Sequence, residues 1–455
     1  MQGTVIIGGG PGGMGPLIWA AQTGNLNGWL RQGVTVIDRQ KMLGGTLGRY
    51  AINSDSLGAA YLECLEAPLA IDALRMLRDD PVTHEMEQYR QAFPPLNLVD
   101  RFMRRIGASL DALIRSHPDC SIRSGTSARA LHVQRDGSIR VELDNGDNLA
   151  ARTAVMALGG KQNWSHQLWE NLRPGLSLSD CRLRHLMSSD RLLTPQGLDE
   201  ITQVLAGAAG RQIVILGGSH SAYSAAWAIT RLIDSNRLGA GQIMILARRL
   251  PPVFYANAEA AMADGYEVQP GDVCPRTGRV HRLGGLRGNG RDIWRQISGR
   301  PATQPETRVR AAMLGDFDVE ALRALLEDAA VVIPAFGYSA ATLPVFTHRK
   351  RRVALHAEAG QSSVDDAGRI LRADGQPLPN LFGIGLGSGY RPSGSMGGEA
   401  NFSGQANSLW LYQNDIGALL YHGIQRCLRQ PLGKAKDSVT EPTGRYPACT
   451  RPALP

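Results

Sequence analysis

Three glycines near the start of the chain have the spacing of a dinucleotide-binding turn. Gly8, Gly10 and Gly13 follow an apolar run over residues 5–7, in the order G-x-G-x-x-G. The first glycine permits a tight turn, the second lets the backbone approach a pyrophosphate, and the third lets the next helix pack against the strand. A helix beginning near Gly12 would point its amino end at that pyrophosphate. We therefore predict that the cofactor is bound by Gly8, Gly10, Pro11, Gly12 and Gly13.

An acidic residue stands where such a unit binds a ribose. Residues 34–37 form a second apolar run, which ends in Asp38, 25 residues beyond Gly13. An acid at this strand end usually binds a ribose hydroxyl. Arg39, and Gly45 and Thr46 in the glycine-rich stretch that follows, are assigned to the same site. The alternative is a strand–helix turn that binds nothing.

A similar unit returns about 200 residues later. The apolar residues 213–216 precede Gly217, Gly218, Ser219, His220 and Ser221. The next strand, over residues 242–247, ends in Arg248 and Arg249, where the first unit has an acid. Because arginine binds a 2′-phosphate that an acid would repel, this pattern favours NADPH. Ser219 replaces the second glycine and weakens the motif, and the arginine pair is alternatively an ordinary surface feature.

Composition narrows the class of protein. At 455 residues, two to three domains are expected. The net charge of +8 comes from 49 basic and 41 acidic residues that are scattered along the chain, which favours anionic small ligands over nucleic acid. The six cysteines form no C-x-x-C pair, and no apolar run is long enough for a membrane span. We expect a cytoplasmic protein with no nucleic-acid or membrane partner; an oligomer is possible.

The remaining pattern alternates between helical and strand-like segments. Residues 57–118 read as mainly helical, and the pairs Asp136-Gly137 and Asn145-Gly146 predict hairpins that lead to a buried strand ending at Gly159. Further apolar blocks cover residues 328–338 and 380–389, followed by a helix over about 403–423 and a polar tail. The predicted fold class is α/β with two Rossmann-like units. The predicted boundaries are 1–165 (first domain), 166–329 (second domain), 330–425 (return to the first) and 426–455 (tail).

The order of these blocks resembles the two-dinucleotide-binding-domain flavoproteins, and within them the FAD- and NADPH-dependent, N-hydroxylating-like monooxygenases. The opening glycine loop resembles their FAD fingerprint, and the turn at Gly159 resembles their interdomain turn. Residues 217–222 resemble their NADPH motif, and residues 328–338 resemble the box that ends in Gly337 and Tyr338. Residues 380–389, with Gly385, resemble the closing FAD strand, and residues 185–190 resemble a connector motif. Phe336, like Ser219, departs from the family pattern.

The resemblance implies an NADPH-binding domain inserted into a discontinuous FAD-binding domain. It also implies a reaction: NADPH reduces FAD, oxygen forms a flavin hydroperoxide, and a small, possibly amino-acid-derived substrate is oxygenated at nitrogen or sulfur. By the same analogy residues 49–56 approach the flavin ring, and Asn53 is the candidate catalytic residue. Two alternatives stay open: an FAD/NAD(P)H oxidoreductase or dehydrogenase without oxygen insertion, and a flavin-binding protein whose NADPH site has decayed. Weaker candidates for the cleft are Gln162, Asn163, Trp164, His185, His220 and the tract over residues 390–401.

Overall fold

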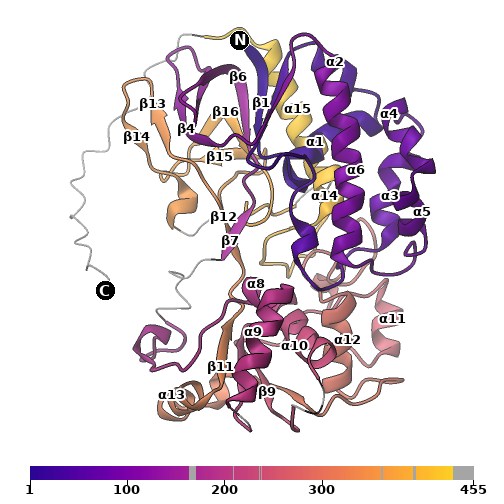
Figure 1. Cartoon of the computed structure of the whole chain (residues 1–455), viewed down its shortest axis with the longest axis vertical. Coiled ribbons are helices and arrows are strands. Elements are labelled where there is room, and N and C mark those ends of the chain that lie inside the picture. Colours follow the sequence, from indigo (N-terminus) through magenta and orange to yellow (C-terminus); the bar gives the residue numbers. More distant parts are fainter. Residues whose placement is uncertain are drawn as a thin grey trace.

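The chain folds into two lobes joined by a pair of short strands (Figure 1). The computed structural model describes residues 1–162, 171–208, 210–234, 236, 238–359, 362–392 and 396–433. The upper lobe in Figure 1 contains both ends of this described chain, and the lower lobe contains its middle. The second lobe is therefore inserted into the first, as the resemblance implied.

The first lobe is built on a mixed sheet with a parallel centre. Strand β1 (Gln2–Ile7) lies between β2 (Val34–Asp38) and β6 (Asn148–Met156), parallel to both. β2 also pairs with β3 (Ser121–Ser124), and β6 also pairs with β16 (Pro377–Gly383). All five residues of β2 are buried, as expected for a strand covered on both faces. The carboxyl ends of β1 and β2 consequently meet at one edge.

Antiparallel hairpins extend this sheet. β4 (Ala128–Val133), β5 (Ile139–Leu143) and β6 form the meander that the sequence predicted, and its turns contain Gly137 and Gly146 at positive φ (+84° and +88°). β13 (Val345–Thr347) joins β4 and pairs with β14 (Arg352–Val353), while β15 (Arg369–Leu371) pairs with β16.

Helix α1 (Pro11–Gln22) packs against two helices from the far end of the chain, α14 (Leu409–Gln413) and α15 (Asp415–Arg429). The approach is close: a Cβ placed on Gly15 would lie 2.3 Å from the carbonyl oxygen of Tyr412. The single helix predicted over 403–423 is thus two helices that divide at Asn414. α15 also continues to Arg429, beyond residue 426, where the tail was expected to begin.

The helical segment predicted over residues 57–118 is present as a separate layer. It comprises α3 (Gly58–Glu66), α4 (Asp72–Arg75), α5 (Pro81–Glu87), α6 (Leu96–Arg115) and a connecting short 3-10 turn. Pro81 begins α5 and Pro95 precedes α6, since proline fits the first turn but lacks the N–H that later turns need. A short α2 (Leu26–Leu30) stands between α1 and β2.

The second lobe has a four-stranded parallel sheet in the order β10, β9, β8, β11. These strands are β8 (Ile213–Leu216), β9 (Ile243–Ala247), β10 (Val309–Met313) and β11 (Val331–Pro334). β11 pairs with β8, so it belongs to the second lobe, and the return to the first lobe comes after it rather than at residue 330. The helices of this lobe are α8 (Ser189–Leu192), α9 (Pro195–Ala206), α10 (His220–Leu232), α11 (Ala258–Ala263), α12 (Gly288–Ile297) and α13 (Val319–Asp328).

The two crossings between the lobes run side by side. β7 (Gly160–Gln162) leaves the first lobe and β12 (Tyr338–Ala340) returns to it, and the two strands form an antiparallel pair. They occupy the middle of the molecule in Figure 1. The predicted fold class, two dinucleotide-binding units of the α/β type, is confirmed.

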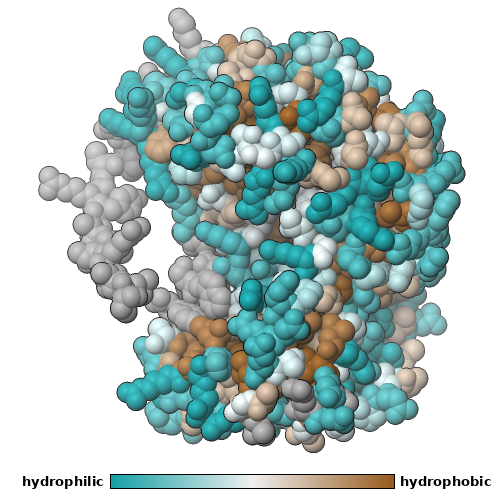
Figure 2. Space-filling view, in the orientation of Figure 1, coloured by the Kyte–Doolittle hydropathy of each residue, from teal (hydrophilic) through white to brown (hydrophobic). Residues whose placement is uncertain are grey.

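The surface in Figure 2 is mostly hydrophilic, with apolar side chains gathered in separate areas of the lower lobe. Among the described residues, no helix combines the length and hydrophobicity that a membrane crossing requires.

Candidate functional site

The first glycine loop has the shape that a pyrophosphate requires. Gly8 adopts φ +105°, and a Cβ there would lie 2.2 Å from the carbonyl oxygen of Ala157. A Cβ on Gly13 would lie 1.8 Å from the Gly8 carbonyl oxygen. Gly10 differs, because a Cβ there would meet only the Cα of Gly45, at 3.7 Å. Packing therefore requires glycine at positions 8 and 13. At position 10 the space in front of the backbone is open, and glycine leaves that space free for a phosphate.

Helix α1 begins directly behind this loop. No side chain caps its amino end, Gly10 being the residue before Pro11. The N–H groups of the first turn have no partner within the helix, and the helix dipole favours an anion there. The loop thus fits the pyrophosphate of FAD on its geometry and on its uncapped helix end.

Asp38 stands at the end of β2, next to the same loop. It is buried, and one of its carboxylate oxygens accepts a hydrogen bond from the N–H of Gly9 (2.5 Å) while the other accepts from the N–H of Gln40 (2.6 Å). The carboxylate therefore holds the glycine loop as well as standing at the position predicted for ribose binding. Arg39, the next residue in the chain, and Thr46 are both exposed.

Three more predicted glycines gather around the start of α1. A Cβ on Gly12 would lie 3.1 Å from the Cα of Gly385, and one on Gly385 would lie 3.8 Å from the Cα of Gly159. Gly45 adopts φ +91° and faces the ring of Pro11. The interdomain turn, the closing strand and the first loop, which are far apart in sequence, therefore meet at one place.

The second glycine loop repeats the first with a more open centre. Gly217 adopts φ +148°, and a Cβ there would lie 2.6 Å from the carbonyl oxygen of Ala335. Ser219 is exposed and precedes α10 with an extended backbone (φ −130°, ψ −171°). A serine adopts this conformation without strain, so the departure from glycine leaves the turn intact. Gly218 packs against Ala247 of the next strand.

Arg248 and Arg249 follow β9 and are both exposed. Arg248 donates to the carbonyl oxygen of Asn171 (2.8 Å), and Arg249 reaches the hydroxyl of Ser403 in the first lobe at 3.4 Å. Neither has an ion-pair partner among the described residues, so both guanidinium charges remain available to an anion. Their role in NADPH binding stays a prediction.

Residues 47–56 connect the first lobe to the second. The N–H of Ala51 donates to the carbonyl oxygen of Leu193 (2.8 Å), and a Cβ on Gly288 would lie 3.1 Å from the carbonyl oxygen of Ser54. Asn53 forms a backbone bridge with Pro95. The side chain of Asn53 is half-buried and forms no hydrogen bond with a described residue, so its catalytic role remains a prediction.

A second contact between the lobes centres on Asp190 at the start of α8. Its carboxylate accepts hydrogen bonds from the hydroxyls of Tyr50 (2.5 Å) and Tyr338 (3.1 Å) and from the guanidinium of Arg49 (3.0 Å). Burial, with a further contribution from the Asp190 hydrogen bond, raises the pKa of Tyr50 to about 12. Gln162 of β7 donates to the adjacent Ser189 at 2.6 Å. These contacts fix the crossing strands to the second lobe.

His220 is the first residue of α10 and belongs to the second glycine loop. Its Nε2 accepts a hydrogen bond from the backbone N–H of Arg287 (3.2 Å). Burial lowers the pKa of His220, so the imidazole is neutral at physiological pH. The guanidinium of Arg287 stacks on the ring of Phe254, 4.0 Å from its centroid, and burial lowers its pKa as well.

The glycine-rich tract before α14 contributes ordered contacts to the second lobe. Glu399 is buried and accepts from the N–H of Leu283 (3.1 Å), and Asn401 donates to Asp272 (2.9 Å). Residues 393–395 of the tract lie outside the described residues, as do Asn163 and Trp164. Gly337 directly precedes the crossing strand β12, and Ser221 is the second residue of α10; their contacts with a cofactor stay predictions.

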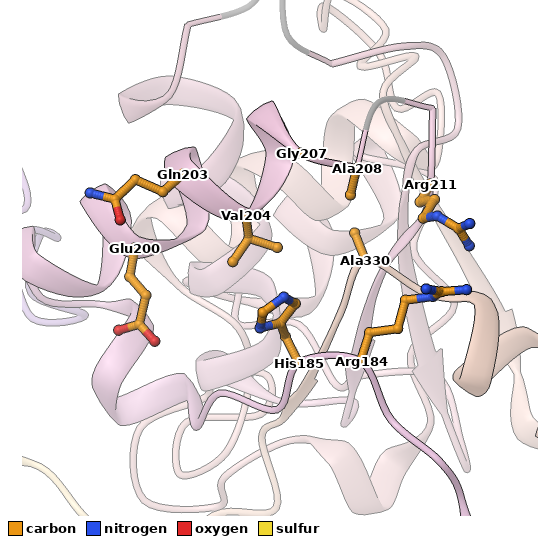
Figure 3. A pocket seen from close by; sticks show the side chains of 9 residues that line it. All are labelled: Arg184, His185, Glu200, Gln203, Val204, Gly207, Ala208, Arg211 and Ala330. Atoms are coloured by element: carbon orange, nitrogen blue, oxygen red, sulfur yellow. The ribbon is translucent and has the colours of Figure 1, made fainter.

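Figure 3 shows a polar cavity of about 530 Å³ elsewhere in the second lobe. Arg211 and Ala330 line it, and these residues precede β8 and β11. It therefore lies at the amino ends of those strands, whereas the glycine loops follow their carboxyl ends, where open α/β sheets bind ligands. His185 lines this cavity and is thus separated from the cofactor loops.

Comparison with known proteins places this geometry in a family. The chain is 33% identical over 435 residues to a CMP-5'-(3-aminopropyl)phosphonate hydroxylase of Streptomyces rubellomurinus, covering 92% of this chain and 97% of that protein. The chain belongs to the family of this hydroxylase, and its fold is that of the class B flavoprotein monooxygenases. No family model matches it.

Two solved structures of class B monooxygenases share the fold. OTEMO in an FAD-bound form matches with a TM-score of 0.50 and 12% identity, covering 94% of this chain and 84% of that one. A flavin-containing monooxygenase from Stenotrophomonas maltophilia matches with a TM-score of 0.50 and 13% identity, covering 93% and 98%. The predicted enzyme class agrees with the hydroxylase named for the relative, and the OTEMO structure contains FAD, one of the two predicted cofactors.

Sequence reasoning did not identify the residues that join the lobes. Asp190 belongs to the connector motif over residues 185–190, but no sequence pattern predicts that Tyr50 and Tyr338 contact it. Arg287, which contacts His220, lies outside every motif found in the sequence.

Proposed function

We propose that this protein is an FAD- and NADPH-dependent monooxygenase that hydroxylates the nitrogen of a small primary amine carried on an anionic group. The observation that carries the proposal is the 33% identity, along almost the whole chain, to a hydroxylase whose substrate is an aminopropyl phosphonate linked to CMP. CMP-5'-(3-aminopropyl)phosphonate is accordingly the first substrate to test. The free cysteines at positions 64, 120, 181, 274 and 427 fit the reducing cytoplasm that we also propose.

When bound, FAD and NADPH would supply the reducing equivalents and the oxygen-activating centre of the reaction. The chain's own residues would position the two cofactors. The loop of Gly8–Gly13 would hold the FAD pyrophosphate at the amino end of α1, and residues 217–221 would do the same for NADPH at α10. Arg248 and Arg249 would bind its 2′-phosphate.

The contacts between the lobes would hold the two cofactor loops in a fixed position relative to each other. Ala51, Ser54 and the Asp190 cluster hold residues 47–56 against the second lobe, so the loop expected near the flavin ring is fixed from both sides. The basic balance of the chain, +8, would attract an anionic substrate as well as NADPH.

Turnover of the purified holoenzyme tests the proposal. NADPH should bleach the flavin absorbance without oxygen, and with oxygen the CMP-linked amine should gain one oxygen atom for each NADPH consumed. Release of peroxide alone with every amine tested, including this one, would overturn it. Transfer of electrons to another acceptor with no oxygenated product would instead assign a dehydrogenase.

A further inference from the structure

Asp55 is an acid between the two lobes that forms no ion pair with the described part of the chain. It lies on the loop of residues 47–56, two positions after Asn53, and is half-buried. Among the described residues, no arginine, lysine or histidine nitrogen lies within 4.0 Å of its carboxylate. The hydroxyl of Ser56 is its one hydrogen-bond donor there, at 3.4 Å. A carboxylate that is partly removed from water normally has stronger partners than this.

The loop around Asp55 is held firmly in place. The N–H of Ser54 donates to the carbonyl oxygen of Pro94 (2.8 Å), and its hydroxyl lies 2.6 Å from that of Tyr61. The same Ser54 hydroxyl accepts from the N–H of Ser56 at 2.9 Å. Asp55 is therefore bracketed by two buried serines whose hydrogen bonds hold the backbone on both sides of it.

Four elements from both lobes bring titratable groups toward this carboxylate. Its charge acts on the titration of Tyr61 on α3, Tyr412 on α14, His220 on α10 and Arg287 before α12. α10 starts at the second glycine loop, and α14 packs against α1, which starts at the first. The carbonyl oxygen of Ser54 faces Gly288 at the start of α12, and the N–H of Arg287 binds His220 at the start of α10, so Asp55 lies where the two predicted cofactor sites approach each other.

None of these groups supplies a matching positive charge in direct contact. The two tyrosines are neutral, and burial keeps His220 neutral. Arg287 is cationic, but it stacks on Phe254 and donates to the carbonyl oxygen of Arg282. A ligand cation that binds here would complete the site.

Resting on the amine hydroxylation proposed above, we propose that Asp55 binds the ammonium group of the substrate and accepts its proton. An alkyl ammonium has an ordinary pKa of about 10.4, so the substrate arrives protonated at physiological pH. Its nitrogen must be neutral before its lone pair can attack an oxygen atom. The step breaks one N–H bond and forms one O–H bond on the carboxylate, giving a neutral amine and a carboxylic acid with no change of oxidation state.

Binding to the oxidised, FAD-loaded enzyme tests the assignment without turnover. The probes are the CMP-linked amine of the proposed function and its isosteric alcohol, in which a hydroxyl replaces the amine. The wild type should bind the amine about 10- to 100-fold more tightly than the alcohol, the range of one charge-assisted contact. Asp55→Asn should abolish this preference while binding the alcohol normally, and Asp55→Glu should restore part of it.

The pH dependence of kcat/KM gives a second readout. In Asp55→Asn, kcat/KM for the amine should rise about tenfold per pH unit, since only the free base then reacts, whereas the wild type should depend much less on pH. The rate at which NADPH reduces the flavin should be unchanged, which shows that the variant is folded. The matched control is Asp144→Asn, an exposed hairpin aspartate.

Two outcomes would overturn the role of Asp55. If Asp55→Asn weakened the binding of the amine and of the alcohol equally, Asp55 would only balance the charge of Arg287. An intact preference for the amine in Asp55→Asn would place the ammonium site elsewhere. Either result requires a wild type that hydroxylates the amine, whereas a wild type that oxygenates no amine contradicts the proposed function instead.

Discussion

Replacing Gly10 with alanine should remove FAD without harming the fold. A Cβ at this position meets only the Cα of Gly45, at an ordinary contact distance of 3.7 Å. The backbone is extended (φ −76°, ψ −175°), a conformation that alanine adopts freely. Loss of glycine's freedom in the unfolded chain should even add about 0.4–1 kcal/mol to the stability of the flavin-free protein.

The cost should appear in flavin binding. A pyrophosphate oxygen that accepts from the first turn of α1 lies about 2.9 Å from a backbone nitrogen, which leaves no room for a methyl group in front of Gly10. Losing two charge-assisted hydrogen bonds of about 1.5–3 kcal/mol each would weaken FAD binding roughly 10²- to 10⁴-fold. Titration of flavin-stripped protein with FAD, followed by quenching of flavin fluorescence, measures this change.

Gly13→Ala is the matched comparison. Its Cβ would lie 1.8 Å from the Gly8 carbonyl oxygen, so the backbone must move, at a cost of at least about 3 kcal/mol in the stability of the flavin-free protein. Thermal melting without flavin should therefore separate the two variants. Wild-type FAD affinity in Gly10→Ala would refute the assignment of the pyrophosphate to this loop, and an unchanged melting temperature in Gly13→Ala would refute the packing role of Gly13.

Two further variants test the role of charge. Replacing Arg248 and Arg249 together with alanine should raise the KM for NADPH about 5- to 100-fold, because roughly 1–3 kcal/mol of phosphate contact is lost, and should leave the KM for NADH unchanged. Arg115→Ala is the exposed control. An unaltered ratio of the two KM values would refute the binding of the 2′-phosphate by this arginine pair. Asp264 is buried and forms an ion pair with Arg295. Burial alone would raise the pKa of Asp264, but the hydrogen bonds from Arg295 outweigh it and lower that pKa. Because a lowered carboxyl pKa stabilises the fold above the unfolded value of 3.8 and the gain disappears as pH falls through the folded pKa, Asp264→Asn should cost about 3 kcal/mol of unfolding free energy at neutral pH and less at pH 3. Urea unfolding at both pH values measures the difference, and a gap that does not depend on pH would contradict it.

The parts of the fold that the sequence predicted are those that local chemistry specifies. The strand–glycine–helix units at residues 5–13 and 213–222 depend on glycines at which a Cβ would clash with a backbone carbonyl oxygen, namely Gly8, Gly13 and Gly217. The hairpins depend on Gly137 and Gly146, whose positive φ a D-G or N-G pair supplies. In each case the signal lies within about ten residues of the structure that it specifies.

The parts that it did not predict depend on long-range pairing. The apolar run of β11 fits either sheet equally well, and only its pairing with β8 places it in the second lobe. The break between α14 and α15 falls at Asn414, where no proline or nearby glycine turn announces it. The tyrosines that meet Asp190 are 140 and 148 residues away, so no local pattern could have brought them together.

The two glycine loops differ in a way that bears on how each cofactor is held. In the first, the carboxylate of Asp38 bonds to the N–H of Gly9, and Gly385 covers the start of α1, so the loop is fixed before any ligand arrives. In the second, Ser219 and the arginine pair are exposed, and the corresponding strand end offers no carboxylate to hold the loop. A preorganised and enclosed site releases its ligand slowly, because little ordering cost opposes binding, whereas an open site with charged groups at its rim exchanges quickly. The structure therefore favours FAD as the resident cofactor and NADPH as the one that binds and leaves.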